Sequence, residues 1–149
     1  MSKIIYTYGV FDLFHVGHLR VLQQARSLGS ILVVGIFTDK VAESFKRKPI
    51  IPERERREII KSIYCVDEVV YQDEFSPQKN IDLIKPTIVA KASGADWEED
   101  NIPQFKGAES ILLKYTEDVS TSRILKDVNA KSLISVPYIV DELNKNING

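Results

Sequence analysis

The stretch Ile4–Phe37, IIYTYGVFDLFHVGHLRVLQQARSLGSILVVGIF, decides the fold. Ile4–Tyr8 is a short apolar run rich in β-forming residues, and it predicts a buried strand. Gly17–Leu28 has apolar residues at helical spacing, and we expect Gly29 to close this helix as a left-handed cap. The unbroken apolar run that ends at Phe37 fits a strand covered on both faces. Strand, helix and strand in this order predict a βαβ unit.

The same alternation continues along the chain. We expect helices at Thr38–Phe45, Glu53–Ile63, Pro77–Ile84 and Thr121–Asp127, and strands at Asp67–Tyr71, Thr87–Ala90 and Ser110–Leu113. This order predicts a single-domain α/β fold with a Rossmann-like, doubly wound parallel sheet. A weak helical pattern follows in Ala130–Gly149, so we divide the chain into a domain of residues 1–129 and a helical extension of residues 130–149.

The composition limits the class of protein. The 149 residues include 20 Lys+Arg and 21 Asp+Glu, and a net charge of −1 argues against a general polyanion-binding surface, so we expect no nucleic-acid partner. No apolar stretch approaches the roughly 18 residues of a membrane span. The N-terminus lacks a signal-peptide pattern, and we expect a cytoplasmic protein without a membrane partner. Cys65 is the single cysteine, so it excludes an internal disulfide framework and a thiolate metal cluster.

Both histidines of the chain, His15 and His18, lie in the loop after the first predicted strand. Ligands of open α/β sheets bind beyond the carboxyl ends of the strands, and a helix N-terminus attracts phosphate. Gly17, between the two histidines, lets a ligand approach the backbone closely. The two imidazoles are placed to bracket one phosphate, or to act as solvated or capping groups. We expect no metal site here, because no third His or Cys accompanies them.

The segment of residues 8–18, YGVFDLFHVGH, resembles the signature of the HxGH nucleotidyltransferases, and most closely their cytidylyltransferase branch, which includes the glycerol-3-phosphate cytidylyltransferases. The resemblance covers about residues 3–127 and continues through Val33–Asp39, Pro52–Arg56, Val66–Val69, Gly94–Trp97 and Val119–Ser122. It implies a Rossmann-like homodimer. It also implies transfer of a nucleotidyl group from a nucleoside triphosphate to a phosphorylated small molecule, with Mg²⁺ and release of pyrophosphate.

The resemblance also implies roles for individual residues. His15 and His18 would contact the triphosphate and stabilise the transition state. Lys46, with Lys48 as second choice, and Arg56 would contact phosphates. The expected nucleotide-binding residues are Gly9, Val10, Phe11, Gly17, Asp96, Trp97, Ser120, Thr121 and Ser122, and the expected acceptor-binding residues are Asp12, Tyr64 and Tyr115. We expect the loop of residues 44–52 to be mobile without nucleotide.

The resemblance therefore predicts an enzyme that transfers CMP from CTP to a small alcohol or polyol phosphate and gives a CDP-alcohol. Tyr64 and Tyr115 stand where the glycerol-phosphate enzymes carry arginine, which points to a different acceptor. Ala95 replaces an aspartate in the segment expected to face the base. Two alternatives remain open. One is an adenylyltransferase that acts on a sugar phosphate or a flavin precursor, and the other is a nucleotide-binding module without catalytic activity.

Overall fold

The computed structural model describes residues 2–94, 97–114 and 121–131, and the chain divides into two compact units, Met1–Glu117 and Asp118–Gly149. The elements described in the first unit are β1 (Ile4–Gly9), α1 (Val16–Ser27), β2 (Ile31–Phe37), α2 (Asp39–Phe45), α3 (Glu53–Lys61), β3 (Glu68–Gln72), α4 (Gln78–Ile84), β4 (Ile88–Ala92) and β5 (Glu109–Leu113). The second unit contains α5 (Thr121–Lys131). The boundary between these two units precedes α5. The expected division of the chain into domains after residue 129 stays a prediction.

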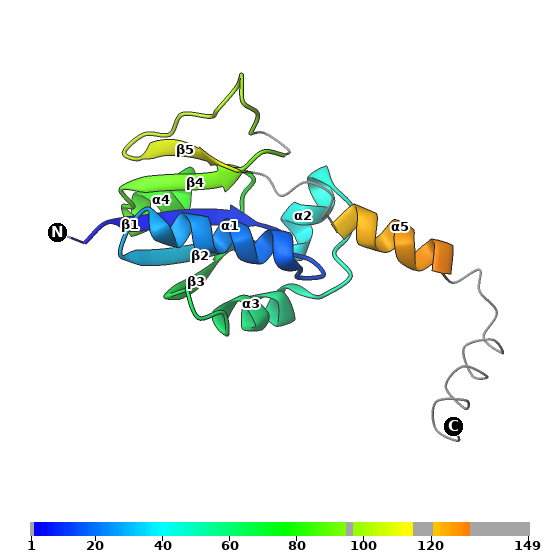
Figure 1. Ribbon diagram of the computed structural model, residues 1–149. Coiled ribbons are helices and arrows are strands. Elements are labelled where there is room, and N and C mark those ends of the chain that lie inside the picture. The colour runs from blue at the N-terminus through cyan, green and yellow to red at the C-terminus, as the bar shows by residue number, and fades with distance from the viewer. Residues whose placement is uncertain (1, 95–96, 115–120, 132–149) are drawn as a thin grey trace. The chain divides into compact units, whose positions relative to one another are not determined.

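The strands described in the first unit form one parallel sheet in the order β3-β2-β1-β4-β5 (Figure 1). Ile5 of the central strand β1 pairs with Leu32 of β2 on one side and with Ile88 of β4 on the other. The chain adds strands in one direction from β1 to β3 and in the other from β4 to β5, so the order reverses between β1 and β4. Ligands of such sheets bind at this reversal. The predicted α/β fold with a parallel sheet is confirmed.

Side chains of β1 alternate between two core clusters on the two faces of the sheet. Ile5 packs in the first cluster, which includes Leu22 of α1 and Ile60 of α3. Tyr6 packs in the second cluster, which includes Ile81 of α4. In Figure 1, α1 and α4 lie on opposite faces of the sheet. The strands are apolar on both faces because helices cover both, which explains the unbroken apolar run of β2.

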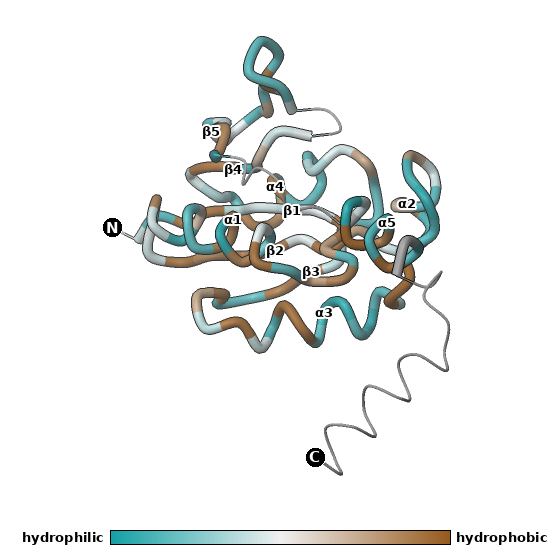
Figure 2. The backbone as a smooth tube through the Cα atoms, turned by 45° about the vertical axis from the view of Figure 1, so that its right-hand side comes forward, coloured by the Kyte–Doolittle hydropathy of each residue, from teal (hydrophilic) through white to brown (hydrophobic). Residues whose placement is uncertain are grey.

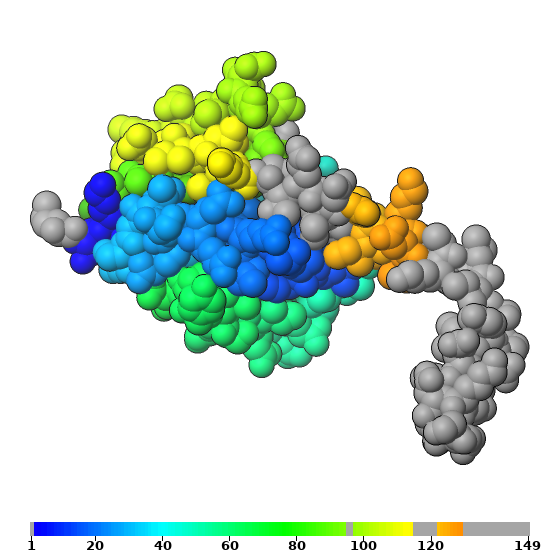
Figure 3. Space-filling model, viewed as in Figure 1, coloured from blue at the N-terminus to red at the C-terminus, as the bar shows by residue number. Residues whose placement is uncertain are grey.

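The helices also bury their apolar side chains and expose their charged ones. Along α3, hydrophobic and hydrophilic residues alternate in Figure 2, and Ile60 is buried whereas Arg54 and Glu58 are exposed. Figure 3 shows α1 lying between β5 and α3 on one face of the first unit. The side chain of Gln24 on α1 bonds both the backbone nitrogen and the backbone oxygen of Lys114, just after β5. These two bonds fasten α1 to the edge of the sheet.

The end of α1 differs from the prediction. The C-cap is Leu28 in a right-handed conformation, so Gly29 does not act as a left-handed cap. A Cβ at Gly29 would lie 2.6 Å from the carbonyl oxygen of Lys3 and 2.8 Å from the side chain of Ile5. Glycine is needed at this position for close packing and not for its backbone conformation.

Gly35 offers a direct test of this packing. A Cβ at Gly35 would lie only 1.9 Å from the hydroxyl of Tyr6, which bonds Gln72 and Asn80 in the interior. We predict that Gly35→Ala lowers the free energy of unfolding by about 2 kcal/mol or more, through overpacking. Adding Tyr6→Phe removes the clashing oxygen, so the double variant is less destabilised than the sum of the single variants. Denaturant unfolding measures all three, and strict additivity would contradict the contact.

Candidate active site

The two histidines form the N-terminal cap of α1. The Nδ1 atom of His15 accepts a hydrogen bond from the backbone nitrogen of Gly17 at 3.1 Å, and the Nδ1 atom of His18 accepts one from the backbone nitrogen of His15 at 3.3 Å. The two rings stack with their centroids 3.8 Å apart. These two hydrogen bonds form a capping box, so both imidazoles are held in place at the N-terminus of α1.

This arrangement determines the protonation of both rings. Because each Nδ1 accepts a hydrogen bond, the proton of the neutral imidazole is on Nε2. Burial lowers the pKa of His15, and burial together with the nearby His15 and Lys46 lowers the pKa of His18 to about 3, against the opposing charge of Asp12. Near neutral pH, the site therefore presents two uncharged Nε2–H donors at a helix N-terminus, which also attracts anions.

The loop between β1 and α1 is strained around a buried carboxylate. Phe11 and Leu13, on either side of Asp12, both have positive φ angles, 53° and 50°. Such backbone is costly for residues other than glycine and is often found at functional sites. The ring of Phe11 is buried and meets the ring of His18 edge-on, with 5.4 Å between the ring centroids. The loop therefore packs directly against the histidine pair. A Cβ at Gly9 would lie 3.1 Å from the same Phe11 ring.

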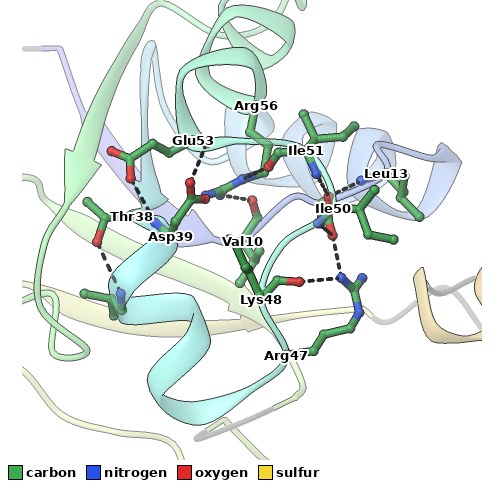
Figure 4. A network of polar contacts seen from close by, with 12 residues as sticks. Val10, Leu13, Thr38, Asp39, Arg47, Lys48, Ile50, Ile51, Glu53 and Arg56 are labelled. Carbon is green, nitrogen blue, oxygen red and sulfur yellow. Dashed lines mark hydrogen bonds and ion pairs between the residues drawn. The ribbon is translucent and has the colours of Figure 1, made fainter.

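Asp12 joins this loop to the segment of residues 46–52. Figure 4 labels Arg47, Ile50 and Ile51 of this segment. Its carboxylate accepts hydrogen bonds from the backbone nitrogens of Ile50 at 2.8 Å and Ile51 at 2.9 Å, and from the Arg47 guanidinium at 2.8 Å. Burial alone would raise the pKa of Asp12, but these donors lower it below its ordinary value. The structure shows that Asp12 anchors this loop through these three hydrogen bonds. The expected binding of the acceptor by Asp12 and the expected mobility of the loop without nucleotide stay predictions.

Arg56 is fully buried in the same network (Figure 4). Its guanidinium donates to Asp39 Oδ1 at 2.7 Å and to the carbonyl oxygens of Val10 at 2.7 Å and Ile51 at 2.8 Å. The guanidinium of Arg56 therefore links Asp39, Val10 and Ile51 in the interior. The expected contact of Arg56 with a phosphate stays a prediction.

Asp39 was not singled out by the sequence reasoning. It follows the apolar strand β2, and it also exchanges hydrogen bonds with Glu53: each backbone nitrogen donates to the other residue's carboxylate, at 3.0 and 3.3 Å. Thr38 caps α2 by accepting from the backbone nitrogen of Val41, which fixes the start of this helix. The signal available in the sequence was a carboxylate directly at a strand end, within VVGIFTD.

The remaining predicted site residues are divided between the surface, the core and the undescribed part of the chain. Lys46 is exposed at the end of α2, and its charge is close enough to lower the pKa of His18. Gly17 is buried in the first turn of α1. Trp97 is fully buried, and its Nε1 donates to the hydroxyl of Tyr8 at 2.8 Å, so the indole supports β1 from the core. Its expected contact with the nucleotide stays a prediction. Tyr64 is 81% exposed and bonds Gln23 on α1.

Five predicted site residues lie outside the described residues or in the second unit. Asp96, Tyr115 and Ser120 lie outside the described residues. Thr121 is the first residue of α5, and Ser122 is exposed on the same helix, which belongs to the second unit. Lys48 is exposed in the anchored loop.

Across residues 2–94, 97–114 and 121–131, there is no group of three or more His, Cys, Asp or Glu placed to hold a metal ion. Within the same ranges, no helix has the length and apolar character that crossing a membrane requires.

Comparison with known proteins identifies relatives. The cytidylyltransferase-like family model matches residues 6–142. HldE, a bifunctional protein, is 38% identical in Citrifermentans bemidjiense over 134 residues and 39% identical in Helicobacter pylori strain P12 over 130 residues. Each match covers 85% of this chain, but the chain spans only 27–28% of these relatives.

Solved structures share the fold. A lipopolysaccharide core biosynthesis protein from Thermoplasma volcanium superposes with a TM-score of 0.69 at 22% identity, covering 78% of this chain and all of that one. Pantothenate synthetase from Thermus thermophilus superposes with a TM-score of 0.50 at 14% identity, covering 94% of this chain and 70% of that one.

The protonation of His18 gives a prediction about stability and pH. Its pKa in the folded chain, about 3, lies below the unfolded value near 6.5, so the unfolded chain binds the proton first as the pH falls. This contribution is complete above about pH 6.5 and is lost toward pH 3, with a slope of at most about 1.4 kcal/mol per pH unit. His18→Gln keeps an acceptor but does not titrate, so its unfolding free energy should fall less steeply between pH 6.5 and 4. If the unfolding free energies of the wild type and of His18→Gln fall with pH in parallel, the burial of a neutral His18 is contradicted.

The buried hydrogen bonds of Arg56 to Asp39, Val10 and Ile51 give a second prediction. Arg56→Met leaves Asp39 Oδ1 and the carbonyl oxygens of Val10 and Ile51 without the guanidinium donor, and we expect a loss of about 3 kcal/mol in unfolding free energy. The matched control is Arg54→Met, an exposed arginine on the same helix, which should change stability by less than about 0.5 kcal/mol. If Arg56→Met keeps wild-type stability and loses only nucleotide affinity, Arg56 is a phosphate ligand, as the resemblance implies, and the structural role is wrong.

Proposed function

The chain belongs to the cytidylyltransferase-like family of nucleotidyltransferases, and from this premise we propose that it transfers AMP from ATP to a sugar phosphate. The products are an ADP-sugar and pyrophosphate. The observation that carries the proposal is the pair of neutral, mutually held histidines at the N-terminus of α1, where the chain leaves the central strand of the sheet.

The chemistry that these residues support is nucleotidyl transfer without a covalent intermediate. A phosphate oxygen of the acceptor attacks the α-phosphorus, the bond from this phosphorus to the bridging oxygen breaks, and pyrophosphate leaves with the electron pair. Charge develops on the phosphate oxygens, so catalysis needs positioned donors more than a nucleophile. The Nε2–H groups of His15 and His18 supply such donors, and Lys46 adds a nearby cation.

The relatives support ATP and a sugar phosphate over CTP and a polyol phosphate. The curated matches reported above are HldE proteins, and this similarity favours the adenylyltransferase alternative over the cytidylyltransferase that the sequence motifs first suggested. The position of Tyr64 agrees with an acceptor other than glycerol 3-phosphate, because an exposed tyrosine on the surface cannot grip a phosphate as an arginine would.

Mg²⁺ belongs to the proposal as a companion of the triphosphate. Magnesium keeps several waters and usually binds through substrate phosphates with one or two carboxylates, so it does not require a protein-built cluster. When bound, it would neutralise charge on the phosphates. We also propose, from the family resemblance, a homodimer that acts in the cytoplasm.

A substrate panel tests the function. We predict that ATP with a hexose or heptose phosphate gives the fastest pyrophosphate release, ahead of CTP with glycerol 3-phosphate or ribitol 5-phosphate, and ahead of ATP with flavin mononucleotide. His18→Ala should lower turnover by at least about a hundredfold, as expected when one transition-state donor is lost. Faster turnover with CTP and a polyol phosphate would restore the first interpretation, and no pyrophosphate release from any pair would indicate a binding module.

A further inference from the structure

Four aromatic side chains and one lysine form a continuous row at the carboxyl ends of the strands. Tyr8 belongs to β1, Phe37 ends β2, Phe75 follows β3, Lys91 lies near the end of β4, and Phe45 ends α2. The arrowheads of the strands in Figure 1 point toward the side where α2 lies. We call these five residues the aromatic row. None of them was assigned a role by the sequence motifs or by the proposed function.

The side chains of the row are in direct contact. Phe37 lies 5.6 Å from Tyr8, 5.1 Å from Phe45 and 6.2 Å from Phe75, measured between ring centroids. Phe45 and Phe75 meet edge-on at 5.0 Å. The ammonium of Lys91 lies 4.5 Å from the centroid of the Tyr8 ring and 5.9 Å from that of Phe37. Cation–π contacts at these distances hold the cation at one end of the row.

The row runs from the core to the solvent. Tyr8 and Phe37 are buried, whereas Phe75 is 42% exposed. Phe75 is also held in place, because the buried side chain of Gln72 donates to the carbonyl oxygens of Glu74 and Phe75 at 3.1 Å. Thus a partly exposed aromatic side chain lies at one end of the row and a half-buried ammonium at the other, with the buried rings of Tyr8 and Phe37 between them.

The row lies on the opposite face of the sheet from the histidines. Tyr8 and Phe37 pack in the second core cluster, whereas Phe11, which touches His18, packs in the first. Phosphoryl transfer places the attacking and leaving oxygens roughly in line through the phosphorus. If the histidines and Lys46 hold the leaving phosphates, the attacking phosphate must approach from the other side of the α-phosphorus.

We infer that the aromatic row is the acceptor subsite, with Lys91 binding the phosphate of the sugar phosphate and Phe75 stacking against the sugar ring. The inference rests on the proposed function and deepens it. An ammonium is a suitable partner for a phosphate, and an exposed aromatic face suits the C–H surface of a sugar. In the transfer step Lys91 keeps its proton and positions the attacking oxygen, so it acts by charge alone.

The test separates acceptor binding from nucleotide binding in the full-length chain. We expect Lys91→Gln to raise KM for the sugar phosphate about tenfold or more, as for loss of a charged hydrogen bond, while the Kd for ATP stays within about twofold. Lys91→Arg should restore most of the affinity. Phe75→Leu, which keeps an apolar side chain but loses the flat ring, should raise KM for sugar phosphates and leave KM for inorganic phosphate or glycerol 3-phosphate unchanged.

The controls come from the same chain. Lys61→Gln on α3 and Leu83→Ala on α4 remove an exposed lysine and an exposed leucine outside the row. Both should leave KM and melting temperature unchanged. Titrating the sugar phosphate against protein saturated with a non-hydrolysable ATP analogue repeats the comparison without turnover.

The outcomes are distinct. Weaker ATP binding by Lys91→Gln with an unchanged sugar-phosphate KM would overturn the inference and place Lys91 beside the nucleotide. If Lys91→Gln and Phe75→Leu bind both substrates as the wild type does, or lose only stability, the aromatic row has a structural role alone and the inference is wrong. If the wild type proves to use CTP or another acceptor, the proposed function fails. The same variants, measured with the pair of substrates that it does use, still test the acceptor subsite.

Discussion

The buried guanidinium of Arg56 is the interaction on which the site depends. It links three segments that are distant in sequence: the turn after β1 through Val10, the start of α2 through Asp39, and the anchored loop through Ile51. A fully buried cation is tolerable only when its donors are all satisfied, so this clasp fixes the geometry of its partners strongly. Asp12 makes a second connection to the same loop, because its carboxylate accepts hydrogen bonds from the backbone nitrogens of Ile50 and Ile51.

Together these two charges hold the strained turn in which the histidines begin α1. The positive φ angles of Phe11 and Leu13 bring the chain sharply from the central strand into the helix. The helix then exposes its N-terminus directly beyond the sheet, where a phosphate would meet the helix dipole and two neutral imidazole donors. Neutral donors suit this position, because a charged pair of imidazoles at 3.8 Å would repel each other at the positive end of a helix.

The sequence predicted the elements of the fold well because strong apolar patterns and the βαβ alternation decide them. It also predicted correctly that the histidine pair lies at the start of α1, where the structure shows that both imidazoles cap the helix. It could not predict that the side chains of Arg56 and Trp97 are fully buried, since a charged or aromatic residue in a motif looks the same whether it is exposed or lies in the core. Burial is a property of the packed structure: Trp97 bonds Tyr8, a residue 89 positions earlier. The aromatic row was invisible for the same reason, because four strands and a helix bring its members together.

The protonation of the two histidines tests the account most directly. They are the only histidines in the chain, so ¹⁵N NMR of labelled protein shows just two imidazole rings. At pH 7 and without ligand, the account predicts that both rings are neutral, with the proton on Nε2 and an accepting Nδ1. Adding ATP should shift the Nε2 resonances of both residues. Imidazolium signals at pH 7, or protons on Nδ1, would contradict the capping geometry and with it the two donors that the proposed chemistry requires.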